Sequence, residues 1–71
     1  MSTRKNLVKA LARKYEAIIA EATATAEIYF DNSVGIGEHP QFVDEIDKQV
    51  EILCNAEEKL EVLKEFKDDW S

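Results

Sequence analysis

Cysteine and histidine each occur once in this 71-residue sequence, which excludes two common ways of stabilising a small protein. Cys54 alone cannot form an internal disulfide, and one thiol with one imidazole, from His39, cannot supply the four ligands of a structural zinc site. Because free cysteine is among the most commonly buried residue types, we expect Cys54 to be a small buried hydrophobic residue and not a reactive thiol. We therefore expect no metal ion and no cofactor.

Long hydrophobic runs are also absent. Arg4 and Lys5 are followed by mixed polar sequence, so the sequence predicts neither a signal peptide nor a transmembrane helix. A length of 71 residues allows one domain, and 45% apolar with 34% charged residues is typical of soluble globular or coiled-coil-like chains. We therefore expect a single domain over residues 1–71, no association with membranes and a cytoplasmic location.

Glycine and proline are confined to one short stretch. Gly35, Gly37 and Pro40 all lie within residues 31–40. Pro40 suits the first turn of a helix, where its missing N–H is not needed, and Asn32 tolerates the left-handed conformation that often follows a helix. One helix is therefore predicted to end here and another to begin.

The two flanking segments have helical periodicity. Apolar or small residues recur three and four apart in both, first at Val8, Leu11, Tyr15, Ile18, Ala22, Thr25 and Tyr29, and then at Phe42, Val43, Ile46, Val50, Leu53, Ala56, Leu60, Leu63 and Phe66. The pattern predicts a helix over about 3–31, a loop over 32–39 and a helix over about 40–67. The fold class is all-α, an antiparallel two-helix hairpin of the coiled-coil type.

Alternating small and polar residues over 20–27 also fit a strand. Alanine is the best helix former and both neighbouring segments are helical, so the helix is favoured. Four alanines, at 20, 22, 24 and 26, indicate that another helix approaches closely there.

Acidic residues are missing from the first 15 residues. This segment carries +5 and the remainder −11. One interpretation is a basic arm that binds nucleic acid or an anionic membrane. The favoured interpretation is that acidic residues of the second helix neutralise this segment, because an antiparallel hairpin would bring Arg13 level with Glu58 and Arg4 level with Asp68. The basic segment also lacks the interleaved aromatic residues on which nucleic-acid bases would stack.

The small size of the chain and the distribution of its apolar residues predict self-association. A lone two-helix seam buries little apolar surface, and chains this small usually need a disulfide, a metal or a partner. Apolar residues outside the main stripe also suggest a second neighbour. We expect a homodimer, with two hairpins forming a four-helix bundle. The residues assigned to self-association are Tyr15, Ile19, Ala22, Ala26, Ile52, Val62 and Phe66.

No catalytic motif is present. The sequence Gly35-Ile36-Gly37 lacks a third glycine, a preceding strand and a following Lys-Ser/Thr pair. Asp44, Asp47 and Glu51 share a helix face that could hold a cation weakly, but a solvated acidic face is favoured. We expect no enzymatic activity.

The loop has two possible roles. Val34 and Ile36 could fold back to cap the end of the hairpin, or the loop could be an exposed recognition tip. In the second case the candidate partner contacts are Val34, Ile36, Glu38 and His39.

Several residues around the loop form a recognisable pattern. They are Tyr29-Phe30, Asn32, Val34-Gly35-Ile36-Gly37-Glu38-His39-Pro40 and, later, Ala56-Glu57-Glu58-Lys59-Leu60. On these residues the sequence resembles small uncharacterised proteins of tailed bacteriophages, especially those of aquatic bacteria, and the likeness covers about half of the chain. The family pattern has proline after the asparagine, where this chain has Ser33, so the loop is less rigid at that point. The resemblance implies a phage setting and an interaction role without naming a partner.

The predicted function is a small helical protein-interaction or structural module encoded by a phage. Its partners would be a second copy of itself and a phage or host protein, in the host cytoplasm or in the virion. The alternative is a nucleic-acid accessory protein that uses the basic N-terminal segment.

Overall fold

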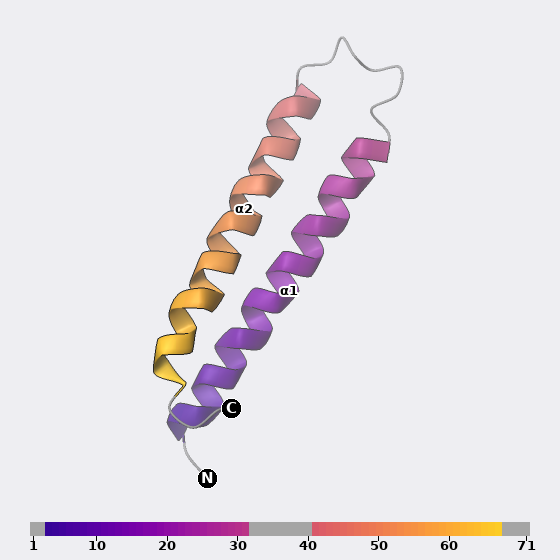
Figure 1. The fold of residues 1–71 in the computed structure, drawn as a ribbon. Helices are drawn as coiled ribbons and strands as arrows, with labels where there is room; N and C mark the ends of the chain where they lie inside the picture. Colours follow the sequence, from indigo (N-terminus) through magenta and orange to yellow (C-terminus); the bar gives the residue numbers. More distant parts are fainter. Residues whose placement is uncertain (1–2, 32–40, 68–71) are drawn as a thin grey trace.

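The computed structural model describes residues 3–31 and 41–67 of the chain. Helix α1 spans Thr3–Asp31 and helix α2 spans Gln41–Leu63, followed by a 3-10 turn, η1, at Lys64–Phe66. Figure 1 shows α1 and α2 side by side with opposite chain directions. The predicted all-α antiparallel hairpin is therefore confirmed. Its pairing into a four-helix bundle involves a second copy and stays a prediction.

The helix bounds can be compared with the predicted ranges. Helix α1 has the predicted range of 3–31, whereas the second helix tightens into η1 after Leu63 instead of continuing to 67. The backbone N–H of Lys67 donates to the carbonyl oxygen of Lys64 at 3.2 Å, which closes this last turn. The candidate contacts Val34, Ile36, Glu38 and His39 lie outside the described residues.

Small side chains line the contact between the two helices. The buried residues of the described ranges are Val8, Ala12, Ala22, Ala26, Ala56 and Leu63. Alanine allows two helix backbones to approach closely, as the sequence predicted for Ala22 and Ala26, while Ala20 and Ala24 are exposed. The alternating pattern of this segment is therefore part of a helix whose buried stripe is narrow.

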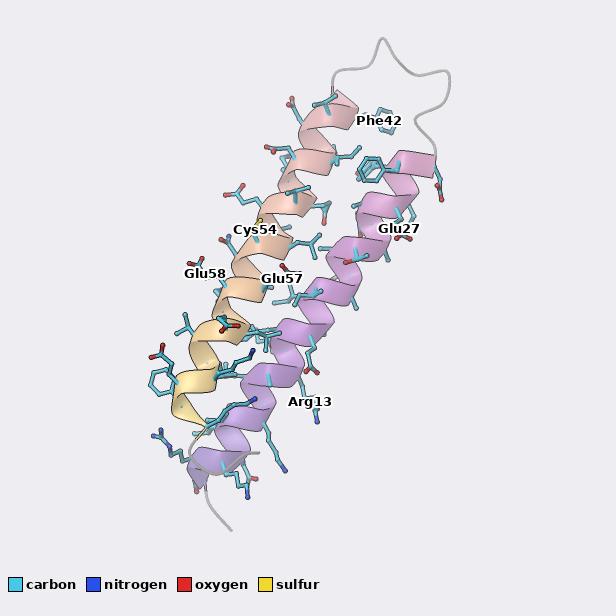
Figure 2. The ribbon with its side chains drawn as sticks, in the orientation of Figure 1. Arg13, Glu27, Phe42, Cys54, Glu57 and Glu58 are labelled. Atoms are coloured by element: carbon cyan, nitrogen blue, oxygen red, sulfur yellow. The ribbon has the colours of Figure 1, made fainter. Side chains whose placement is uncertain are left out.

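Contacts at both ends hold the hairpin in register. At the closed end, where α1 ends and α2 begins, the rings of Tyr29 and Phe42 meet edge to face, with centroids 5.6 Å apart and planes at 82°. Figure 2 shows Phe42 reaching from α2 toward α1. At the open end, where α1 begins and η1 ends, Arg4 Nη2 donates to the carbonyl oxygen of Phe66 at 3.2 Å.

The molecule is a rod with a large surface. It measures 54 × 16 × 16 Å with a radius of gyration of 16.3 Å, against about 11 Å for a compact domain of this length. Its accessible surface is 5507 Å², whereas a compact monomer of 8.1 kDa exposes about 4,500 Å². The isolated hairpin therefore leaves about 1,000 Å² more surface in water than folded monomers of its mass do.

Enlarging a buried alanine should destabilise the hairpin. Ala22 is 2% exposed, so Ala22→Leu would push the helices apart and lower the free energy of unfolding by about 1–3 kcal/mol. Ala24→Leu is the matched control, because Ala24 is exposed and should change stability by less than about 0.5 kcal/mol. Urea unfolding followed by circular dichroism at one protein concentration measures both. Equal stabilities for the two variants would contradict the close approach at Ala22.

Candidate interaction surface

An apolar groove lies along the helix contact at the open end of the hairpin. Its volume is about 610 Å³, and its wall is almost entirely hydrocarbon. Its apolar lining residues come from α1, α2 and η1 and include Leu7, Val8, Leu11, Val62, Leu63 and Phe66. A groove of this kind, open to water along a helix pair, is the form of site that accepts another helix.

Helical geometry separates the floor of the groove from its flanks. Val8 and Leu63 are 8% and 7% exposed and pack together with Ala12 to form the floor. The neighbouring positions are turned toward water, so Leu7 is 60% exposed on one flank and Val62 is 51% exposed on the other. Large apolar side chains gathered at a groove and exposed to this degree make it a candidate interaction surface.

The same face continues toward the closed end as a shallower depression. Its volume is about 220 Å³, and Ile18 of α1 and Ile52 of α2 lie on its two sides. We call the surface made by Leu7, Leu11, Ile18, Ile52, Val62 and Phe66 the groove face. The opposite face has a depression of about 410 Å³ whose lining includes Glu16, Glu57, Glu61 and Lys64, so its chemistry is more polar.

The residues predicted to mediate self-association are divided by the structure into three groups. Ile52, Val62 and Phe66 lie on the groove face, and Tyr15 lines the groove half-buried, with Lys59 Nζ 5.7 Å from its ring centroid. Ile19 is on the opposite face.

Ala22 and Ala26 form the third group. They are buried at 2% and 6% exposure against α2, so in this arrangement they offer nothing to a second copy. Their contact is with the other helix of the same chain.

Three residues of the groove face are missing from the predicted set. The sequence places Leu11 and Ile18 in the helix seam, yet Leu11 is 38% exposed and Ile18 is only half-buried. Leu7 has no predicted role although it is 60% exposed. The signal for Leu7 is the doublet Leu7-Val8, because two adjacent apolar residues near a helix start make the stripe wider than one partner helix can cover.

Arg13 and Glu58, which the sequence predicts to lie at the same level of the hairpin, do not form an ion pair with each other. Arg13 Nη1 lies 3.2 Å from Glu16 Oε1 on the same helix, and Figure 2 shows Arg13 and Glu58 on the outer sides of different helices. The reason is rotation about the helix axis: Ala12 faces α2, so the next residue is turned about 100° away. The other predicted pair, Arg4 with Asp68, includes a residue outside the described ranges.

Two further ion pairs are also local. Lys48 Nζ lies 3.4 Å from Glu45 Oε2, and Lys64 Nζ lies 3.1 Å from Glu61 Oε1, each three residues apart on α2 or at its junction with η1. Their side chains are well exposed, so each contributes only a few tenths of a kcal/mol. Neither pair includes a residue of the basic N-terminal segment, so these two pairs do not compensate its charge.

Cys54 is exposed, which corrects the prediction that it is buried. It follows Leu53, which is half-buried, and the helical rotation carries its thiol to the outer side of α2, where Figure 2 labels it. The usual burial of cysteine as a residue type was too weak a signal to predict the position of Cys54 on the helix.

Over residues 3–31 and 41–67, no group of three or more histidine, cysteine or acidic side chains is arranged to hold a metal ion. Asp44, Asp47 and Glu51 therefore do not form such a group. Neither described helix is long and apolar enough to cross a membrane. The chain matches no protein-family model, no curated protein and no solved structure. Among the described residues, the groove face is the candidate functional surface.

The thiol of Cys54 should react with an aromatic disulfide reagent without unfolding of the protein. Because its side chain is exposed, the rate in the folded state should lie within about tenfold of the rate in urea. Absorbance of the released thiolate measures both rates. A thiol that reacts only as fast as the chain unfolds would show that α2 turns Cys54 inward.

Proposed function

We propose that this chain is a helical protein-interaction module that self-associates through the groove face. The observation that carries the proposal is the apolar groove at the open end, where Leu7, Leu11, Val62 and Phe66 are 60%, 38%, 51% and 49% exposed. Transfer of such side chains from water to a protein interface is favourable by about 25 cal/mol per Å² of apolar area. A partner that covers the groove therefore stabilises the hairpin as it binds.

The small core supports the same proposal. No large side chain in the described ranges is fully buried, and four of the six buried residues are alanines. The hairpin leaves about 1,000 Å² of extra surface in water, and one side of a standard protein interface covers about 800 Å². One interface of ordinary size would bring the molecule to the exposure of a normal folded protein.

A second copy is the simplest partner that satisfies these conditions. Two hairpins stacked groove face to groove face make a four-helix bundle, in which Ile18 and Ile52 extend the covered stripe beyond the groove. The expected mass is about 16 kDa, twice the 8.1 kDa of the chain. The resemblance around the loop supports a phage setting for this module, in the host cytoplasm or in the virion.

Sedimentation equilibrium at micromolar concentration tests self-association. The parent should sediment as a dimer, and Val62→Glu should weaken dimerisation at least tenfold, because it buries a carboxylate without a partner. Val43→Glu is the matched control: Val43 is 69% exposed and lies at helical spacing from Glu57 and Lys64, on the opposite face. It should dimerise like the parent.

Two results would contradict the proposal. A cooperatively folded 8.1 kDa monomer at these concentrations would remove the need for a second copy. Equal weakening by Val62→Glu and Val43→Glu would mean that the groove face is not the surface used.

A nucleic-acid accessory protein is the second candidate. Its supporting observation is that Arg4, Lys5, Lys9, Arg13 and Lys14 are all exposed on the first four turns of α1. Against it, phosphate binding uses basic and polar groups, whereas the wall of the groove that Arg4 and Lys59 border is almost entirely hydrocarbon.

Fluorescence anisotropy with duplex and single-stranded DNA separates the two candidates. An interaction module should show no binding at moderate salt. Tight binding that falls steeply with salt concentration would favour the nucleic-acid function, because phosphate contacts release counterions.

A further inference from the structure

Charge is separated along the long axis of the hairpin. The open half, residues 3–15 and 56–67, holds eight basic and four acidic residues, a net charge of +4. The closed half, residues 16–31 and 41–55, holds one lysine and eight acidic residues, a net charge of −7. Two copies aligned in the same direction would stack like charges, and two aligned in opposite directions would stack unlike charges.

One flank of α1 carries a row of four residues with the same separation of charge, a basic residue nearer the open end and an acidic residue nearer the closed end. Leu7, Lys14, Glu21 and Ile28 are seven residues apart, so they follow one another along the same side of the helix. Leu7 lines the groove and Glu21 lines its shallower continuation, which places the row on the edge of the groove face. Leu7 and Ile28 are 60% and 59% exposed.

This row is complementary to itself when read in the opposite direction. Leu7 then stands opposite Ile28, and Lys14 stands opposite Glu21. Within the part of the chain that the structure describes, neither Lys14 nor Glu21 forms an ion pair. Thr25 Oγ1 bonds to the backbone carbonyl of Glu21 at 2.9 Å, not to its carboxylate.

We propose, on the basis of the self-association proposed above, that two copies pack antiparallel, with α1 against α1 of the second copy. In this arrangement, called head-to-tail packing below, the open end of each copy lies on the closed end of the other. A two-fold axis passes between the levels of Lys14 and Glu21, and each contact occurs twice. Leu7 of either copy meets Ile28 of the other, Lys14 meets Glu21, and Ile18 lies close to the axis. The basic open half of each copy covers the acidic closed half of the other.

The competing arrangement places open end on open end. It gathers Leu7, Leu11, Val62 and Phe66 of both copies, but it runs α1 along α2 of the second copy. Lys14 then stands opposite Lys59, and the two halves of +4 lie together. The arrangements differ in the sign of the charge that faces Lys14, so one substitution distinguishes them.

Charge reversal at this row is the test. Head-to-tail packing predicts that Lys14→Glu weakens the dimer about tenfold at low salt, because two attractive contacts become repulsive, and that Glu21→Lys does the same. The double variant Lys14→Glu/Glu21→Lys should return to within about threefold of the parent, since the pairs are restored in reverse. These differences should shrink at high salt.

Arg13→Glu is the matched control. It makes the same change in charge one residue away, but Arg13 points outward, so the dissociation constant should stay within about threefold of the parent. Sedimentation equilibrium gives the constants, and circular dichroism confirms that each variant remains helical.

The outcomes separate the orientation from the proposed function. A parent dimer that Lys14→Glu tightens would overturn head-to-tail packing in favour of the competing arrangement. A parent dimer unaffected by either single variant, or not restored in the double variant, would overturn it as well. A monomeric parent would overturn self-association itself.

Discussion

The close approach of α1 and α2 through alanine is the contact on which the rest of the structure depends. Ala22 and Ala56 are each 2% exposed, and side chains this small let the two backbones pack tightly. A tight seam of small residues is also a poor source of hydrophobic stabilisation, because few methylene groups leave water. The larger apolar residues are displaced to the flanks, where they form the groove.

The seam and the groove are therefore two results of one sequence pattern. Position 8 faces the partner helix and position 7 faces water, although both are large aliphatic residues. A two-helix contact can cover a stripe about two residues wide, and this chain has a wider one at its open end. The surplus width leaves large apolar side chains of α1 and α2 exposed beside the seam.

The sequence predicted the architecture well because its signals were long and consistent. Two periodic segments and the confinement of Gly35, Gly37 and Pro40 to one stretch placed α1 and α2 with little ambiguity. The surroundings of individual side chains were harder to predict, as Arg13 and Cys54 show, because each next residue of a helix is turned about 100° and can face water where its neighbour faces the other helix. Periodicity locates a stripe, but it does not determine which edge of the stripe faces out. Ala22 and Ala26 were assigned both to a close helix contact and to self-association, because periodicity does not tell which helix covers a small residue, and in the structure they are buried against α2.

The order in which the seam can close follows from its end contacts. Tyr29 and Phe42 are 13 residues apart in the chain, whereas Arg4 and Phe66 are 62 apart. The entropy lost in closing a chain segment grows with its length, by about 1.4 kcal/mol between these two separations if the second contact closed alone. Contacts near the loop therefore form first, and pairing proceeds outward by short steps. We therefore expect the groove, which lies at the open end, to be completed last, after the contacts between residues closer in the sequence have formed.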